Sequence, residues 1–212
     1  NSATTRVFDS VRDIMTETMT ADYGNTSSLH TKGVEAEQYV REARAEIAKS
    51  LRGKEKEIIF TSGGTESNNL AILGTALANR RSGNHIITSC IEHASVYNTT
   101  AFLEEQGFRV TYLPVDHNGH VSPENLRILV SIMYVNNEMG AVEPIAKLAQ
   151  VLRETKPQAY FHADAIQAYG KYVIRPKKEG IDLLSVSGHK IHGPKGVGFL
   201  YVDERVKIRP IL

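Results

Sequence analysis

The sequence predicts an α/β domain built on a mostly parallel, seven-stranded sheet that is covered by helices on both faces. Two observations lead to this prediction. Short apolar runs rich in β-branched residues alternate along the chain with segments of helical periodicity, an order that is typical of parallel sheets. The chain also has 212 residues, of which 41% are hydrophobic and 23% charged, so it can bury one substantial core.

The apolar runs predict the strands, because short segments of this composition are typical of buried strands. In chain order they are Glu57–Thr61, His85–Ser89, Arg109–Leu113, Ile128–Val135, Ala159–His162, Leu183–Ser187 and Val197–Val202. Helices are predicted at Glu35–Leu51, Ser67–Arg80, Ser95–Gln106 and Ile145–Thr155. The first of these helices has an apolar face with helical spacing, formed by Val40, Ala43, Ile47 and Leu51.

The elements are organised as one domain with an arm. Residues 1–30 are expected to form an N-terminal arm and a first helix, and residues 31–212 form the α/β domain. The connection over residues 113–128 is short for a parallel crossover, because it offers little more than a turn at Asn118-Gly119. We therefore expect a deletion or missing residues near Arg127-Ile128.

Charge and cysteine content narrow the class of function. The net charge is +1 and the basic residues are scattered, so no nucleic-acid partner is expected. No apolar run reaches the length of a membrane span, and no signal peptide opens the chain, so no membrane partner is expected. The single cysteine, Cys90, is interpreted as a small buried residue at a strand end. One cysteine is typical of a reducing compartment, which predicts a cytoplasmic location, or the mitochondrial matrix in a eukaryote.

Lys190 lies in the most informative motif of the chain, residues 187–196, directly after a predicted strand. The carboxyl ends of strands are where α/β proteins hold their ligands. Apolar and glycine-rich surroundings can lower the pKa of a lysine ammonium group enough for it to act as a nucleophile or base. The alternative is an ordinary surface lysine, but the neighbouring residues favour the functional interpretation.

Gly63, Gly64 and Thr65 follow the strand that ends at Thr61 and open the next predicted helix. Backbone N–H groups at a helix start can hold a phosphate, glycine allows close approach, and Thr65 adds a hydroxyl donor. A simple turn is the alternative. The segment lacks the Gly-Lys-Ser/Thr of a P-loop and the G-x-G-x-x-G of dinucleotide sites, so nothing favours a nucleotide.

Three other strand ends carry polar side chains. His93 can stack on an aromatic ligand or move protons, and helix capping is the alternative. Asn136 and Asn137 suit either a turn or hydrogen bonds to a ligand. Asp164 lies close to Gln167 and beside apolar residues, where burying its charge costs free energy unless the carboxylate faces a cation such as a protonated ring nitrogen. No metal site is expected, because the histidines and the cysteine form neither a CxxC pair nor an HExxH motif.

The five strand ends together predict a site for pyridoxal 5'-phosphate. This cofactor requires a lysine for a covalent link, a carboxylate for the pyridine nitrogen, a group that stacks on the ring and a cup for the phosphate. Lys190, Asp164, His93 and the turn at Gly64-Thr65 match these four requirements.

On these motifs the chain resembles the large domain of the cysteine desulfurases, which are fold-type I pyridoxal phosphate enzymes of the class V aminotransferase-like group. The resemblance extends over nearly the whole chain. It is carried by residues 2–5, 23–25, 27–30, 61–69, 92–93 and 136–138, by Asp164 with Gln167, and by residues 187–196. Asn137-Glu138 and residues 193–196 resemble the branch that serves nitrogenase and general iron–sulfur cluster assembly.

The resemblance implies a role for each candidate residue. Lys190 carries the cofactor and removes the Cα proton of L-cysteine. Asp164 keeps the pyridine nitrogen protonated, and His93 stacks on the ring and assists proton transfer. Gln167 bonds to the phenolic oxygen, and Asn137 orients cofactor and substrate. The phosphate is held by Gly64, Thr65, Ser187 and His189.

The reaction that the resemblance implies converts L-cysteine to L-alanine and transfers sulfur to an enzyme cysteine for iron–sulfur clusters or thio-cofactors. A homodimer is implied, together with an iron–sulfur scaffold or another sulfur-acceptor protein as partner. Family members are longer, so a C-terminal small domain that carries the accepting cysteine is expected beyond Leu212, and Cys90 does not occupy its place. Two alternatives stay open: a related lyase that acts on selenocysteine or cystine, and an inactive fragment that binds a partner as half of a split enzyme.

Overall fold

The computed structural model describes residues 2–121 and 129–211, and a seven-stranded sheet forms its centre, with strand order β1-β7-β6-β5-β4-β2-β3. The strands are β1 (Ile58–Thr61), β2 (His85–Ser89), β3 (Arg109–Leu113), β4 (Leu129–Met133), β5 (Tyr160–Asp164), β6 (Leu183–Ser187) and β7 (Gly198–Val202). The block from β3 to β6 is parallel, whereas β7 runs antiparallel to both β6 and β1. The prediction of a mostly parallel, seven-stranded sheet is therefore confirmed.

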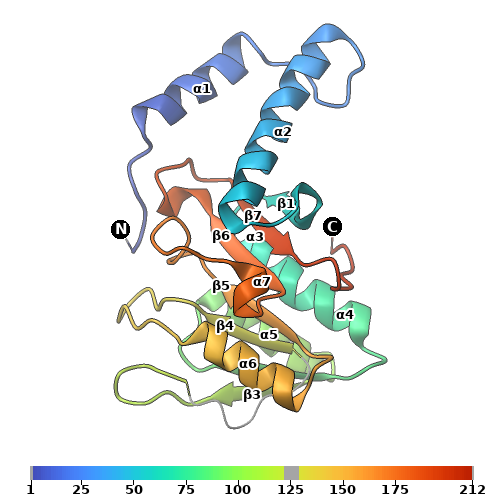
Figure 1. Cartoon of the computed structure of the whole chain (residues 1–212), viewed down its shortest axis with the longest axis vertical. Helices are drawn as coiled ribbons and strands as arrows, with labels where there is room; N and C mark the ends of the chain where they lie inside the picture. The colour runs from blue at the N-terminus through green and yellow to red at the C-terminus, as the bar shows by residue number, and fades with distance from the viewer. Residues whose placement is uncertain (1, 122–128, 212) are drawn as a thin grey trace.

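Helices cover both faces of this sheet, as the sequence predicts (Figure 1). One face packs against the end of α2 (Thr31–Leu51) and against α6 (Ile145–Thr155). The other face packs against α5 (Ala94–Glu105) and against a continuous helical run. That run consists of α3 (Gly64–Asn69), the π-helical turn η2 (Leu70–Gly74) and α4 (Thr75–Asn79). The remaining elements are α1 (Asp9–Thr20), α7 (Pro176–Glu179) and the 3₁₀ turns η1 (Glu55–Glu57) and η3 (Gly188–Lys190).

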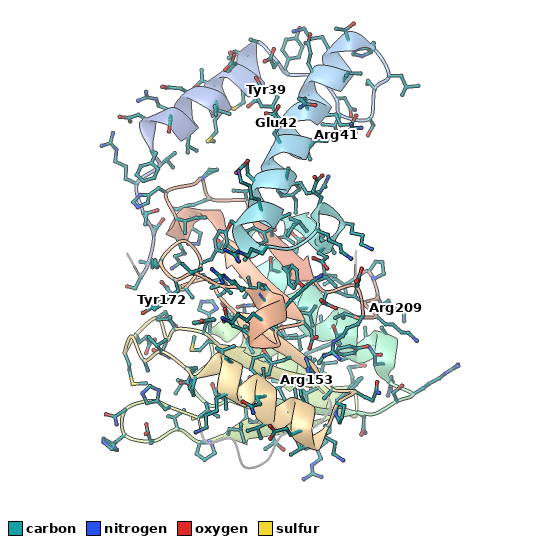
Figure 2. All side chains as sticks on the ribbon, viewed as in Figure 1. Tyr39, Arg41, Glu42, Arg153, Tyr172 and Arg209 are labelled. Atoms are coloured by element: carbon teal, nitrogen blue, oxygen red, sulfur yellow. The ribbon has the colours of Figure 1, made fainter. Side chains whose placement is uncertain are left out.

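The first long helix departs from its prediction in length and in its buried face. It begins at Thr31 rather than Glu35, and of its predicted apolar face only Leu51 is buried, while Ala43 is exposed. The reason is its placement: α2 extends beyond the sheet (Figure 1), so Ala48 and Leu51 at its end are buried in the core and Ile47 packs against it. Figure 2 shows Tyr39, Arg41 and Glu42 on the extended part.

The N-terminal helix α1 lies at the same end of the molecule as the extended part of α2, away from the sheet (Figure 1). None of its side chains is buried. A hydrogen bond from Tyr39 Oη to Asp22 Oδ2, at 2.7 Å, ties α2 to the segment that follows α1. Residues 1–30 thus contain an arm and a helix that contribute little to the core.

The predicted deletion near Arg127-Ile128 lies outside the described residues. Within the described residues, β3 and β4 do not pair with each other, because β2 lies between them in the sheet. Within residues 2–121 and 129–211, no helix is both long and apolar enough to cross a membrane.

Candidate active site

A cavity of about 390 Å³ lies at the carboxyl ends of the parallel strands, and all nine residues to which the resemblance assigns a role contribute to its wall, whereas Gly63 and Asn136 do not. Those nine residues are Gly64, Thr65, His93, Asn137, Asp164, Gln167, Ser187, His189 and Lys190. The wall also contains six residues that were not predicted as site residues: Ser2, Ala3, Ser95, Met133, Val135 and Ile166. Because strands that run in the same direction end at the same edge, five strand ends meet here, and Ser2 and Ala3 of the N-terminal arm add a sixth segment.

Lys190 is placed by η3, the short turn that follows β6. Its Nζ donates to the backbone oxygen of Ala3 at 2.8 Å and to that of Ser2. Partial burial lowers the pKa of Lys190 from the ordinary 10.5, and the nearby Lys171 ammonium lowers it further, while the Asp164 carboxylate opposes both effects. A lowered pKa increases the fraction of free amine, which is the form that attacks a carbonyl.

Asp164 ends β5 and is only 4% exposed. Its Oδ2 accepts from Asn68 Nδ2 at 2.9 Å, and its Oδ1 accepts from the Ile166 N–H at 3.0 Å. Burial raises the pKa of Asp164, whereas these hydrogen bonds and the charges of His93 and Lys190 lower it. A cation in the cavity would stabilise the ionised carboxylate, as the sequence analysis expects.

His93 both caps a helix and faces the cavity, so its two interpretations are compatible. It is the N-cap of α5, and its Nδ1 accepts from the Ser95 N–H at 3.1 Å. The neutral ring then carries its proton on Nε2. Ser95 Oγ lies 2.8 Å from Nδ1 and accepts from Asn68 Nδ2 at 2.9 Å, which links His93 to Asp164 through Ser95 and Asn68.

Asn68 is the central residue that sequence reasoning missed. Its amide joins Asp164 and Ser95, and it is fully buried. One signal was available, because Asn68 stands four residues after Gly64 in the same motif, one helical turn along α3. Its partners lie on other elements, so the pairing depends on the fold.

The turn before α3 has the backbone geometry of a close-approach site. Gly63 has φ +147°, a conformation that side-chain-bearing residues rarely adopt. A Cβ at Gly64 would lie 2.1 Å from Ile166 Cδ1, so glycine is what leaves room beside the cavity. Ser187, 2% exposed at the end of β6, lines the same part of the wall. The start of this helical run therefore presents backbone N–H groups, and Ser187 adds a hydroxyl. An anion is stabilised at such a position.

The two adjacent asparagines have different environments. Asn136 is 5% exposed and forms the turn, because its Oδ1 accepts from the N–H groups of Glu138 and Met139 at 2.9 and 2.8 Å. Asn137 lines the cavity. Gln167 also lines it, with its Nε2 donating to the Ser2 oxygen at 2.8 Å.

The interpretation of Cys90 as a buried residue is wrong, because Cys90 is exposed. It follows β2 and lines a different cavity, of about 540 Å³, whose wall it shares with Glu92, His93 and Asn137. The segment after β2 turns outward to reach α5, so the side chain does not continue the buried row of the strand.

The cavity fits pyridoxal phosphate on the chemistry of its wall. A lysine amine and a buried carboxylate interact electrostatically across it. Gly64 and Thr65 offer a helix start on another side, and His93 contributes a flat ring. Among the described residues no cluster of three His, Cys, Asp or Glu side chains is placed to hold a metal ion.

Comparison with known proteins agrees with this arrangement. Residues 1–212 match the family described as aminotransferase class-V. The chain is 50% identical to "Putative cysteine desulfurase IscS 1" of Bacillus subtilis (strain 168) over 219 residues, which is 100% of this chain and 57% of the relative. It is 51% identical to "Cysteine desulfurase IscS" of Methanosarcina thermophila, with 100% of this chain and 54% of the relative covered.

Solved structures share the fold over the whole chain. A "NIFS-LIKE PROTEIN" superposes with a TM-score of 0.96 at 39% identity, covering 100% of this chain and 60% of that one. "SspA in complex with cysteine" superposes with a TM-score of 0.94 at 40% identity, covering 100% and 63%. The chain spans about half the length of the curated relatives it matches. Through its full-length family match, the chain belongs to the aminotransferase class-V family, whose members depend on pyridoxal phosphate.

Proposed function

We propose that the chain is the cofactor-binding part of a pyridoxal phosphate-dependent cysteine desulfurase. The observation that carries the proposal is that Lys190, Asp164 and His93 line a single cavity with a glycine-rich helix start. The names of the relatives support the choice of activity, and the cysteine complex of SspA supports L-cysteine as the substrate.

The proposed reaction breaks the C–S bond of L-cysteine. Its sulfur passes to an enzyme thiol, which becomes a persulfide, and the remaining carbon takes up a proton to give L-alanine. Pyridoxal phosphate, when bound, stabilises negative charge that develops on the carbon atoms of the substrate. Cys90 does not line the main cavity, so we assign the accepting thiol to another cysteine of the full-length enzyme.

In this proposal each wall residue has one task. Lys190 Nζ holds the cofactor and moves the Cα proton, because its lowered pKa makes the free amine accessible. Asp164 holds a proton on the ring nitrogen, and Asn68 fixes the carboxylate that does so. His93 stacks on the ring and moves a proton at Nε2. Phosphate binding is assigned to Gly64, Thr65, Ser187 and His189, and ring and substrate orientation to Gln167 and Asn137.

We also propose how this part fits the whole protein. Residues 31–212 form the large cofactor-binding domain and residues 1–30 its arm and first helix, which is supported by the start of α2 at Thr31. A small domain that completes the enzyme, a homodimer, and an iron–sulfur scaffold or other sulfur acceptor are proposed from the resemblance. A cytoplasmic location is proposed, with an organelle matrix as the alternative, which a "Cysteine desulfurase, mitosomal" of Trachipleistophora hominis supports.

The test of the cofactor site is the visible absorbance of the purified chain. We expect the protein to gain a yellow absorbance band with pyridoxal phosphate, and Lys190→Ala to lose that band completely because the covalent link is gone. Lys195→Ala, an exposed lysine in the same motif, is the matched control and should keep the band. A wild-type protein that never gains the band contradicts the proposal.

The activity is tested separately with L-cysteine and a reductant on the full-length enzyme. Equal amounts of alanine and sulfide are expected. If the enzyme is fully loaded with cofactor but forms neither product, the desulfurase assignment is contradicted, whereas the assignment of the cofactor site is not.

A further inference from the structure

The N-terminal arm crosses the turn that carries Lys190 and is bound to it by backbone hydrogen bonds. The Thr5 N–H donates to the His189 oxygen at 2.9 Å, and the Phe8 N–H donates to the His192 oxygen at 3.1 Å. The arm and the turn are far apart in the sequence, since 184 positions separate Thr5 from His189. The conformation of the Lys190 turn is therefore set partly from outside its own segment.

The Thr5 side chain connects the peptide groups on both sides of Lys190. Its hydroxyl donates to the oxygen of His189, the residue before the lysine, at 3.0 Å. The same hydroxyl accepts from the N–H of His192, two residues after the lysine, at 2.8 Å. One hydroxyl thus spans the turn and holds its two ends at a fixed separation.

The turn needs such support, because one of its residues has an unfavourable backbone conformation. His192 has φ +65°, which is uncommon for a residue with a side chain. The Phe8 ring stacks on the His192 ring, with centroids 4.1 Å apart and planes 13° from parallel. Conformations of this kind persist where surrounding contacts hold them, and here those contacts come from the arm.

We infer that Thr5 is a positioning residue for Lys190: it fixes the turn so that the lysine amine points into the cavity. The inference rests on the proposed function of Lys190, but the contacts of Thr5 do not depend on which substrate the enzyme uses. Thr5 does not line the cavity, so its effect on cofactor binding must pass through the turn.

The experiment compares three variants of the full chain. Thr5→Val keeps the shape of the side chain but removes the hydroxyl, and Thr5→Ser restores the hydroxyl. Thr4→Val is the matched control, because the Thr4 hydroxyl makes only long contacts with His189, at 3.3 and 3.4 Å. Three properties are measured: the dissociation constant of pyridoxal phosphate, the circular dichroism of its bound absorbance band, and amide hydrogen exchange of residues 189–193 without cofactor.

For Thr5→Val we expect cofactor binding about tenfold weaker, circular dichroism of the bound band reduced by about half, and faster exchange in the turn. Thr5→Ser should restore all three properties, and Thr4→Val should leave them unchanged. The circular dichroism reports the orientation of the bound ring, which a loss of stability alone would not alter. Unchanged binding and dichroism in Thr5→Val, or the same losses in Thr4→Val, would overturn the inference.

The test separates this inference from the proposed function. If the wild-type chain binds the cofactor and Thr5→Val binds it equally well, only the positioning role fails. If the wild-type chain does not bind the cofactor at all, the proposed function fails, and the positioning role fails with it.

Discussion

Glu92 shows how one residue beside the site stores a proton. Its Oε1 accepts from Ser89 Oγ at 2.5 Å and from the Met133 N–H at 3.0 Å, whereas its Oε2 is buried and has no hydrogen-bond partner among the described residues. Burial raises the pKa of Glu92 to about 8. At neutral pH the carboxyl is therefore mostly protonated, with one oxygen accepting two hydrogen bonds and the other carrying the proton.

This proton makes the stability depend on pH. Because the folded state keeps a proton that the unfolded state releases, Glu92 lowers the free energy of unfolding as the pH rises from about 4.5 to about 8. Glu92→Gln imitates the protonated form, so it should be more stable than wild type at pH 8, on the order of 4 kcal/mol, with the gain vanishing at pH 4.5. Urea denaturation across this range measures the difference. Glu105→Gln, on the exposed side of α5, is the control, and a gain independent of pH would contradict the assignment.

At the scale of single residues, the sequence predicts the side chains that face the cavity better than it predicts the residues that hold those side chains in place. Lys190 and Asp164 were predictable because each follows or ends a recognisable strand. Asn68 and Thr5 were not, because their partners stand 96 and 184 positions away. Their roles depend on tertiary contacts that no local pattern contains.

At the scale of elements, α6 supports one face of the sheet from which the site is built. Ile145, Leu148 and Leu152 are at most 2% exposed and pack against the face that contains Val130 and Phe161. The bounds predicted from the sequence, Ile145–Thr155, are those of α6. For α2 only the end of the predicted face reaches the core, at Ile47 and Leu51, because most of that helix has no sheet beneath it.

Removing one of these side chains should leave a cavity that the packed sheet cannot refill. We expect Leu152→Ala to lower the free energy of unfolding by about 2–5 kcal/mol. Gln150→Ala, on the exposed side of the same helix, should change it by less than about 0.5 kcal/mol. Chemical denaturation measures both, and equal effects of the two substitutions would refute the packing argument.

At the scale of the whole molecule, the central sheet and the N-terminal helix α1 differ in how many side chains they bury. The sheet carries fully buried residues on β4, β5 and β6, while α1 buries none. The class of fold could be predicted because alternation of strands and helices implies a parallel sheet. The strand order and the reversal of β7 could not, because hydrophobic pattern does not specify neighbours.

This difference predicts a gradient of local stability. Amides of α1 should exchange with solvent at least about a hundredfold faster than amides of β4 and β5, because opening α1 exposes no buried side chain. Native-state hydrogen exchange of the chain, followed by mass spectrometry, measures the ratio. Equal protection of α1 and the sheet would show that a further surface covers α1.

The docking of the arm on the Lys190 turn has a consequence for biosynthesis. Ser2 and Lys190 are 188 positions apart, and a ribosome that adds about 5–20 residues per second needs about 10–40 s to cover that distance. During this interval the arm has emerged but its binding partner does not yet exist. The cofactor capture proposed for Lys190 can therefore follow only after both segments have been synthesised, and a nascent chain that has acquired the cofactor has already brought residues 2–5 and 188–192 together.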